Sequence, residues 1–241
     1  MVEFAGAHVV VTGGTGALGT AVVGALRAAG AVCHIPNLVA HEADAFAYAS
    51  DPGVHLARGV ELTDATAVKK FYQSVPQLWA SVHLAGGFAM APIAEISTAD
   101  FEAQLRMNAL TCFMCTQAAV AGIRARSEPG PGGARGGRIV NVAARPALEP
   151  RTGAGMVAYA ASKAAVAALT QTLGEELAEE QIWVNAVAPS ILDTPANRAA
   201  MPDADFTRWV ALDAIAAVIG FLASPQNGAT RGAVLPVYGG A

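Results

Sequence analysis

The chain has 241 residues, of which 54% are hydrophobic and 14% are charged, and its formal net charge is −4. A single α/β domain commonly reaches this length, so we expect one domain spanning residues 1–241. The charge leaves no basic excess to bind a nucleic-acid backbone, and no apolar run reaches the roughly 20 residues that span a bilayer, which argues against nucleic-acid and membrane partners.

The amino-terminal segment Met1–Val11 runs directly into a predicted strand, without a basic flank or a cleavage site. It is not typical of a signal peptide, so a cytoplasmic location is expected. The three cysteines, Cys33, Cys112 and Cys115, are too few for a secreted disulfide framework. Cys112 and Cys115 lie in an apolar run without a nearby histidine, so we interpret them as core residues and expect no metal site.

Short β-branched runs alternate with alanine-rich stretches along the chain, a pattern typical of a parallel sheet with helices on both faces. We therefore predict a doubly wound, Rossmann-like fold with seven strands. The predicted strands are His8–Thr12, Ala31–Ile35, Val54–Leu56, Ser81–Leu84, Arg138–Val142, Trp183–Val187 and Val234–Val237. The predicted helices are Leu18–Ala29, Ala65–Val75, Thr98–Arg126, Val157–Glu180 and Asp213–Ala223. Residues 127–137 contain two prolines and five glycines, and we expect a mobile surface excursion within the same domain.

A glycine-rich turn connects the first predicted strand to the first predicted helix. Glycines at such a turn let backbone N–H groups approach a pyrophosphate, and the helix dipole favours the anion. The turn predicts a dinucleotide site formed by Thr12, Gly13, Gly14, Thr15, Gly16, Ala17, Leu18 and Gly19.

Tyr159 and Lys163 are four residues apart on one predicted helix, so their side chains share a face. An ammonium beside a phenol favours the phenolate and is expected to lower the pKa of the tyrosine. Such a tyrosine can exchange a proton with a substrate during hydride transfer.

Together, the glycine turn and the Y-x-x-x-K pattern resemble the short-chain dehydrogenase/reductase family, although Ala17 replaces the middle glycine of its T-G-x-x-x-G-x-G motif. The resemblance implies an NAD(P)H-dependent enzyme with Tyr159, Lys163 and Asn108 as catalytic residues, Lys163 also bonding the nicotinamide ribose. It implies further cofactor contacts from Asn37, Glu61, Leu62, Ala85, Gly86, Gly87, Pro189, Ser190, Ile191 and Thr194.

Two positions depart from the family pattern in ways that bear on chemistry. Asn37 is neutral where dinucleotide folds often carry an acid, so the choice between NADH and NADPH stays open, and an ordinary turn residue would look the same. Ala144 stands where the family places a serine that holds the substrate carbonyl. Either a hydroxyl such as that of Thr152 replaces this serine, or the substrate does not need it.

One branch of the family, the dihydropteridine reductases, resembles this chain in its tail, Leu192-Asp193-Thr194-Pro195-Ala196-Asn197-Arg198, and in Ala85-Gly86-Gly87-Phe88. This branch also lacks the serine. The resemblance implies reduction of a quinonoid dihydropterin or similar flat ring, with Phe88, Ala144, Met156 and Trp209 at the substrate. The alternatives are a general carbonyl reductase or alcohol dehydrogenase, and a non-catalytic NAD(P)-binding regulator.

The helical stretches Ala103–Ala121 and Ala158–Ala178 are rich in alanine, whose small side chain lets helices approach closely. They could form the interface of a homo-oligomer, either a dimer or a tetramer, although burial within one subunit would explain the alanines equally well.

Overall fold

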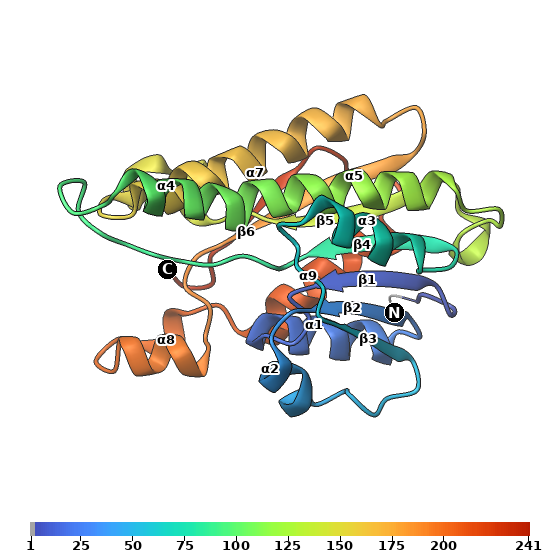
Figure 1. The fold of residues 1–241 in the computed structure, drawn as a ribbon, viewed down its shortest axis with the longest axis horizontal. Coiled ribbons are helices and arrows are strands. Elements are labelled where there is room, and N and C mark those ends of the chain that lie inside the picture. The colour runs from blue at the N-terminus through green and yellow to red at the C-terminus, as the bar shows by residue number, and fades with distance from the viewer. Residues whose placement is uncertain (1–2) are drawn as a thin grey trace.

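The computed structural model describes residues 3–241 (Figure 1). Seven strands form one parallel sheet in the order β3-β2-β1-β4-β5-β6-β7, which confirms the predicted doubly wound fold. The chain order reverses between β1 and β4, and ligands of such sheets bind at the carboxyl ends of the strands beside this point. The strands are β1 (His8–Thr12), β2 (Val32–Asn37), β3 (Val54–Arg58), β4 (Leu78–His83), β5 (Gly137–Val142), β6 (Ile182–Pro189) and β7 (Val234–Val237).

The central strands are buried on both faces, as expected for a parallel sheet covered by two helical layers. In β1, Val9 and Val11 join one core cluster while Val10 joins the other. Alternate side chains of a strand point to opposite faces, so a run of β-branched residues supplies both cores at once. All six residues of β4 are buried for the same reason.

The two helical layers are plain in Figure 1. The helices α1 (Ala17–Ala28) and α9 (Leu212–Ala223) pack together on one face of the sheet. The other face carries α3 (Ala65–Gln73), α5 (Thr111–Arg124) and α7 (Val157–Glu176).

The structure corrects several predicted boundaries. The predicted helix Thr98–Arg126 consists of α4 (Thr98–Gln104), one π-helical segment (Leu105–Leu110) and α5, because propensity does not reveal a change from i→i+4 to i→i+5 hydrogen bonding. Strand β2 continues through Pro36 to Asn37, since these residues still pair with Ala57 and Arg58 of β3. Three short helices were not predicted: α2 (Ala40–Ala45), α6 (Arg145–Leu148) and α8 (Pro195–Ala200).

The segment predicted as residues 127–137 lies at the amino ends of the strands and includes a short 3₁₀ turn, Pro131–Gly133. Its last residue, Gly137, already belongs to β5. The Arg126 side chain donates to the carbonyl oxygens of Glu128 (2.8 Å) and Gly136 (2.7 Å), which ties both ends of the segment together. Its mobility stays a prediction.

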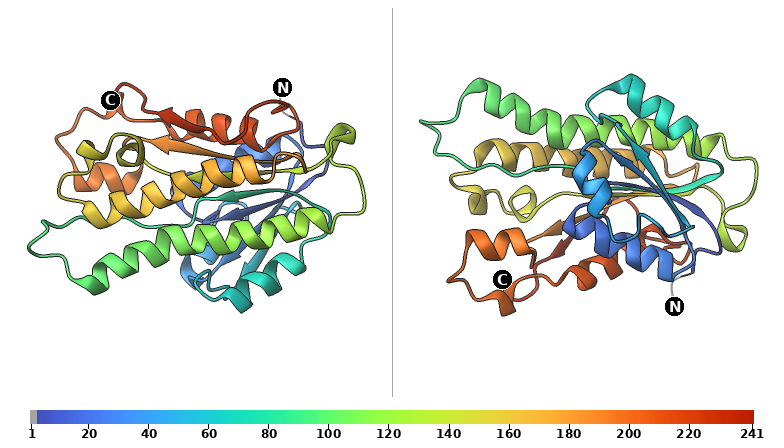
Figure 2. Two further views of the ribbon diagram at one scale, coloured as in Figure 1. Left: turned by 90° about the horizontal axis from the view of Figure 1, so that it is seen from above. Right: turned by 60° about the horizontal axis from the view of Figure 1, so that its bottom comes forward.

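At the opposite edge, residues 84–97 and the α8 region extend beyond the carboxyl ends of the strands, toward the end of the molecule where α7 begins (Figures 1 and 2). These two segments flank the predicted site. Within residues 3–241, no helix is both long enough and apolar enough to cross a membrane.

Candidate active site

The glycine turn joins the carboxyl end of β1 to α1, beside the point where the strand order reverses. The Thr12 hydroxyl accepts a hydrogen bond from the backbone N–H of Ala85 (3.2 Å), which links this turn to the segment after β4. Gly13 has φ +66°, and a Cβ there would lie 2.8 Å from the nitrogen of Ala85. A side chain at this position would be strained by the positive φ and would clash with Ala85, so only glycine fits. Without a side chain here, the backbone of the turn stays accessible to a ligand.

The last residues of the glycine turn begin the first helix. Gly16 caps α1, and Ala17 and Leu18 form its first turn. The alanine in place of the middle family glycine is therefore accommodated in ordinary helical backbone. A dinucleotide pyrophosphate fits this cradle, since the N–H groups of the first helical turn have no partners within the helix.

Three polar side chains meet where β2 ends. Asn37 is the last residue of β2 rather than an ordinary turn residue, and only 5% of it is exposed. Its Nδ2 donates to the Thr15 hydroxyl (3.2 Å), which in turn donates to a carboxylate oxygen of Glu42 (3.0 Å). Glu42 lies on α2 and was missed by sequence reasoning, because neither its position nor that short helix matches a family motif.

Glu61 and Leu62 follow β3 at the same edge. The Glu61 carboxylate accepts from the backbone N–H (2.8 Å) and the hydroxyl (2.9 Å) of Thr63, so it stabilises its own turn. These hydrogen bonds are local to the turn. A cofactor contact from either residue stays a prediction.

Asn108 lies in the π-helical segment and holds the chain after β4. Its Oδ1 accepts from the Gly87 N–H (3.1 Å), and its Nδ2 donates to the Gly87 carbonyl (3.0 Å) and to the Ser162 hydroxyl on α7 (3.0 Å). A Cβ at Gly86 would lie 2.5 Å from the Asn108 Oδ1 and 3.5 Å from the Lys163 Nζ. The glycines Gly86 and Gly87 thus allow the backbone to lie directly against this amide.

Tyr159 and Lys163 lie one turn apart on α7, as predicted, beside this cluster. The Lys163 Nζ donates to the carbonyl of Val142 at the end of β5 (2.9 Å), and 7% of the residue is exposed. Burial lowers the pKa of Lys163 to about 8. Its ammonium therefore titrates near the working range of an enzyme.

The expectation that Lys163 lowers the pKa of Tyr159 is wrong for the ligand-free protein. Burial raises the pKa of Tyr159 to about 12, because the charged phenolate loses solvent. The Lys163 Nζ lies 5.9 Å from the centre of the ring and is already bonded to Val142. The phenol is consequently held in its protonated form.

Ala144 lies just after β5 and is 97% buried, with 3% exposed. The expected substitute, Thr152, is exposed, and its hydroxyl donates to the Glu149 carbonyl (2.8 Å). Its hydrogen is thus already taken within its own turn. This arrangement does not support Thr152 as a replacement for the missing serine.

The remaining predicted residues line the outer part of the site. Pro189 ends β6, the Ser190 hydroxyl donates to the Tyr238 carbonyl (2.8 Å), and Ile191 is exposed. Thr194 caps α8 by accepting from the Asn197 N–H (3.1 Å). Pro195 at the first helical position and Thr194 before it were a helix-start signal that sequence reasoning did not use.

Three of the residues predicted to lie at the substrate, Phe88, Met156 and Trp209, differ in environment. Phe88 is 58% exposed and meets the Tyr159 ring edge-on, with 4.9 Å between ring centres. Met156 is half-buried at the start of α7. Trp209 is 8% exposed and packs on Phe206, so its present contacts are those of a core residue.

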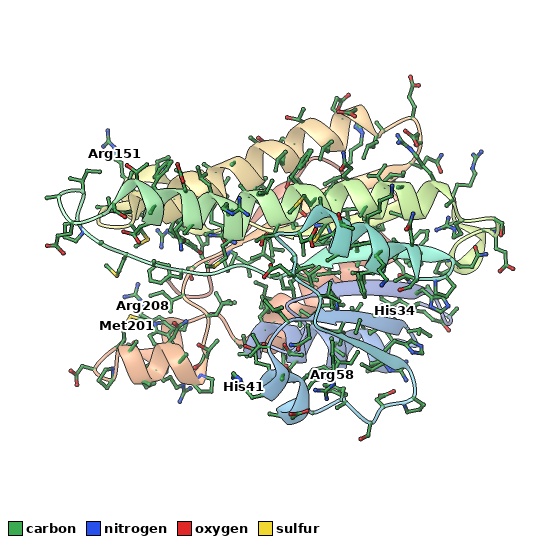
Figure 3. All side chains as sticks on the ribbon, in the orientation of Figure 1. His34, His41, Arg58, Arg151, Met201 and Arg208 are labelled. Atoms are coloured by element: carbon green, nitrogen blue, oxygen red, sulfur yellow. The ribbon has the colours of Figure 1, made fainter. Side chains whose placement is uncertain are left out.

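The Arg198 guanidinium lies over the Phe206 ring in a cation–π contact. Its Nε also forms an ion pair with the Asp193 carboxylate (2.5 Å). These contacts brace the α8 segment, and Figure 3 shows Met201 and Arg208 of this region at the same end of the molecule as Arg151.

The cysteines are buried, and burial raises the pKa of Cys112 to about 11 and that of Cys115 to about 12, so both thiols stay protonated. Across residues 3–241, no group of three histidine, cysteine or carboxylate side chains is arranged to hold a metal ion.

Comparison with known proteins identifies the family. Residues 7–205 match the family model described as short chain dehydrogenase. The L-xylulose reductase of Mesocricetus auratus is 29% identical, with 98% of this chain and 96% of that protein aligned. A 3-oxoacyl-acyl-carrier-protein reductase of Thermotoga maritima is 30% identical over 75% of this chain and 74% of that protein.

A blue fluorescent protein from a metagenomic library, solved in complex with NADPH, has the same fold. Its TM-score is 0.83 at 27% identity, with 98% of this chain and 97% of that chain covered. Because the family match covers most of the chain and includes the glycine turn and the Y-x-x-x-K pair, NAD(P)H is the cofactor class. The chain belongs to the short-chain dehydrogenase/reductase family of oxidoreductases.

Proposed function

We propose that this protein is an NAD(P)H-dependent reductase of an activated, flat heterocycle of the quinonoid dihydropterin class. The observation that carries the proposal is Ala144, with Thr152 turned to its own backbone. A ketone develops negative charge on its oxygen as it is reduced, and a missing donor at that point costs several kcal/mol. A quinonoid ring is already activated, so one proton donor suffices for it.

In this proposal the chain supplies one proton and the positions of the reactants. NAD(P)H supplies the hydride when bound. Tyr159, which burial keeps protonated, donates its proton to a nitrogen of the quinonoid system as that system accepts the hydride. Lys163 lies one turn away with its Nζ on the Val142 carbonyl, where the resemblance places the contact to the nicotinamide ribose, and Asn108 keeps Gly86 and Gly87 against the site. Phe88, Met156 and Trp209 are the proposed ring contacts.

A carbonyl reductase is the second candidate, because it has its own support. The relatives named above are reductases of L-xylulose and of 3-oxoacyl carrier protein. Asn108 also stands where the resemblance to the family places a catalytic asparagine. If the substrate is a ketone, Tyr159 is the only proposed hydrogen-bond donor to its oxygen.

Steady-state turnover of NADH and NADPH with quinonoid dihydropterin and with a ketone panel separates the two candidates. The proposal expects the pterin to be reduced at least about 100-fold faster than any ketone, a difference the missing donor can supply. Turnover of ketones as fast as the pterin would overturn it. No turnover of either substrate class would favour the non-catalytic alternative.

The Ala144→Ser variant sharpens this test. Restoring the hydroxyl is expected to raise kcat/KM for ketones about tenfold or more while changing pterin reduction less than about threefold. Ala144→Cys is the matched control, since the thiol has a similar shape and is a weak donor. Equal effects of the two substitutions on ketones would contradict a role for the missing hydrogen bond.

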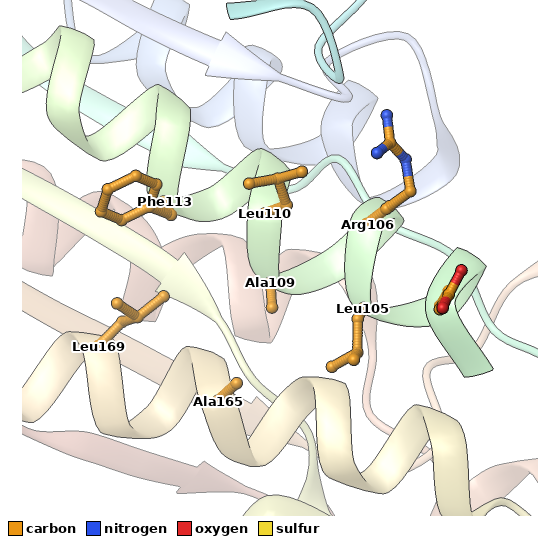
Figure 4. A pocket seen from close by; sticks show the side chains of 8 residues that line it. Leu105, Arg106, Ala109, Leu110, Phe113, Ala165 and Leu169 are labelled. Carbon is orange, nitrogen blue, oxygen red and sulfur yellow. The ribbon is translucent and has the colours of Figure 1, made fainter. Parts of the chain in front are cut away.

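We further propose that the protein forms a homo-oligomer through the surface shared by α4, α5, the π-helical segment and α7. Leu105, Ala109, Leu110, Phe113, Ala165 and Leu169 line an apolar hollow between these helices (Figure 4). Phe113 is 44% exposed, and exposed aromatic residues in an apolar patch are typical of protein interfaces. Light scattering after size exclusion tests this, with Phe113→Asp expected to yield monomers. A cytoplasmic location stays a prediction.

A further inference from the structure

The carboxyl end of β2 contains a carboxylate that no family motif supplies. Glu42 of α2 is bonded to Thr15 in the glycine turn, and Thr15 is bonded to the buried amide of Asn37. In dinucleotide folds this corner holds the adenosine ribose, and the charge of the side chains there decides between a 2′-hydroxyl and a 2′-phosphate.

From this arrangement we propose that Asn37 and Glu42 together read the adenosine ribose and make the protein select NADH over NADPH. The inference rests on cofactor binding by this fold and not on the identity of the substrate. Glu42 takes the place of the acid that usually ends the second strand, but it reaches the corner from the following helix.

The Asn37 side chain supplies the first part of the argument. Its Nδ2 is committed to Thr15, whereas its Oδ1 is buried and has no hydrogen-bond partner within residues 3–241. A buried acceptor without a donor is unfavourable, so a group that donates to it is stabilised. A ribose hydroxyl can donate this hydrogen bond, and a phosphate ester that has replaced the hydroxyl cannot.

The charges around the corner supply the second part. The Glu42 carboxylate is held 3.0 Å from the Thr15 hydroxyl, so its negative charge stays beside the turn. Arg58, the cation that ends β3, is paired with Asp44 of α2 at 2.8 Å. His41 and Arg58 both lie by α2 in Figure 3. A dianionic 2′-phosphate would therefore lie close to the Glu42 carboxylate, and the like charges would repel. The Arg58 guanidinium would not offset this repulsion, because it is paired with Asp44.

The NADPH found in the structural neighbour does not decide the preference of this chain. That protein is 27% identical, and one or two side chains at this corner are enough to change the choice of nucleotide.

Isothermal titration of the full-length protein with NADH and NADPH, without substrate, tests the inference. At low salt we expect NADH to bind at least about tenfold more tightly, with the ratio shrinking as salt screens Glu42. The pair 5′-AMP and 2′,5′-ADP should show the same ratio, because the two nucleotides differ only in the 2′-phosphate and lack the nicotinamide. NADPH binding as tightly as NADH would overturn the inference.

Substitutions of Glu42 separate its charge from general effects. Glu42→Gln should tighten NADPH binding about tenfold and change NADH binding less than about threefold, and Glu42→Lys should reverse the preference. The control is Glu179→Gln, which makes the same change in net charge at an exposed position after α7. An unchanged ratio in Glu42→Gln, or an equal change in the control, would overturn the inference. Selective NADH binding without pterin turnover would leave it intact and contradict only the proposed function.

Discussion

Two clusters of polar side chains lie at different depths in this molecule, and their hydrogen bonds are completed in different ways. One is formed by Tyr72, Ser81, His83, Asn141 and Thr170 in the core. The other, at the carboxyl edge, is formed by Asn108, Tyr159, Ser162 and Lys163.

The core cluster is a closed chain of hydrogen bonds. The links run from Tyr72 to Ser81 (2.8 Å), on to His83 (2.8 Å), to Asn141 (2.8 Å) and to Thr170 (2.9 Å). Thr170 donates to the Val166 carbonyl, so its oxygen accepts from the Asn141 amide, and the Asn141 Oδ1 faces His83. The imidazole then donates from Nδ1 and accepts at Nε2. Every group is satisfied inside the protein.

The edge cluster is anchored to backbone and keeps its reactive groups at the site. Asn108 and Lys163 bond to the carbonyls of Gly87 and Val142, while the half-buried Tyr159 meets the exposed ring of Phe88 edge-on. Burial lowers the pKa of Lys163 to about 8 and that of His83 to about 4. Burial thus moves the pKa of Lys163 toward neutral pH and the pKa of His83 away from it. The structural cluster therefore differs from the reactive one in having all its hydrogen bonds made within the protein core, and not only in how deeply it is buried.

The largest expected effect separates the two tyrosines. Tyr159→Phe should lower kcat about 10²- to 10⁴-fold, because the proton donor is lost, and leave the unfolding temperature nearly unchanged. Tyr72→Phe is the matched control: it removes the hydroxyl of a fully buried tyrosine and should cost about 1 kcal/mol of stability with kcat retained. Steady-state kinetics and thermal unfolding of both variants check this. Loss of activity in both, or in neither, would remove the proposed distinction.

The next effect concerns the middle of the core cluster. His83→Ala should lower the free energy of unfolding by about 3 kcal/mol, because it leaves a cavity and strands the polar groups of Ser81 and Asn141. The activity of the molecules that remain folded should change little. Urea unfolding and active-site titration measure the two quantities. A loss of less than about 1 kcal/mol would indicate that water replaces the imidazole without cost.

The contrast also explains which features could be predicted from sequence. β1 and β7 have their predicted bounds, since β-branched runs between turns leave little choice of register. Tyr159 and Lys163 share a helix face because their spacing is local. Asn37 was expected at the ribose corner by its distance from the glycine turn, but its pairing with Thr15 and Glu42 depends on the path of the chain between β2 and β3.

The core cluster was not predicted at all. Its members come from α3, β4, β5 and α7, so they are distant in sequence and no spacing rule connects them. The π-helical segment that carries Asn108 was missed for another reason, since its residues have ordinary helical propensity. The direction of the Tyr159 pKa was wrong because it depends on how much solvent the phenol loses.

The smallest expected effect is the pH dependence of stability that His83 contributes. Its pKa is about 4 in the folded protein and 6.5 as the ordinary value, so the unfolded chain binds more protons between these limits. The stabilisation from neutral His83 is complete above pH 6.5 and is lost as the pH falls toward 4, at up to about 1.4 kcal/mol per pH unit. His34, whose pKa burial lowers to about 3, acts in the same direction and remains in His83→Ala. Urea unfolding between pH 7 and pH 4.5 should therefore give a steeper loss for the wild type than for His83→Ala. If the free energy of unfolding fell with pH equally in both proteins, water would reach the His83 imidazole. The core cluster would then be as open to solvent as the edge cluster.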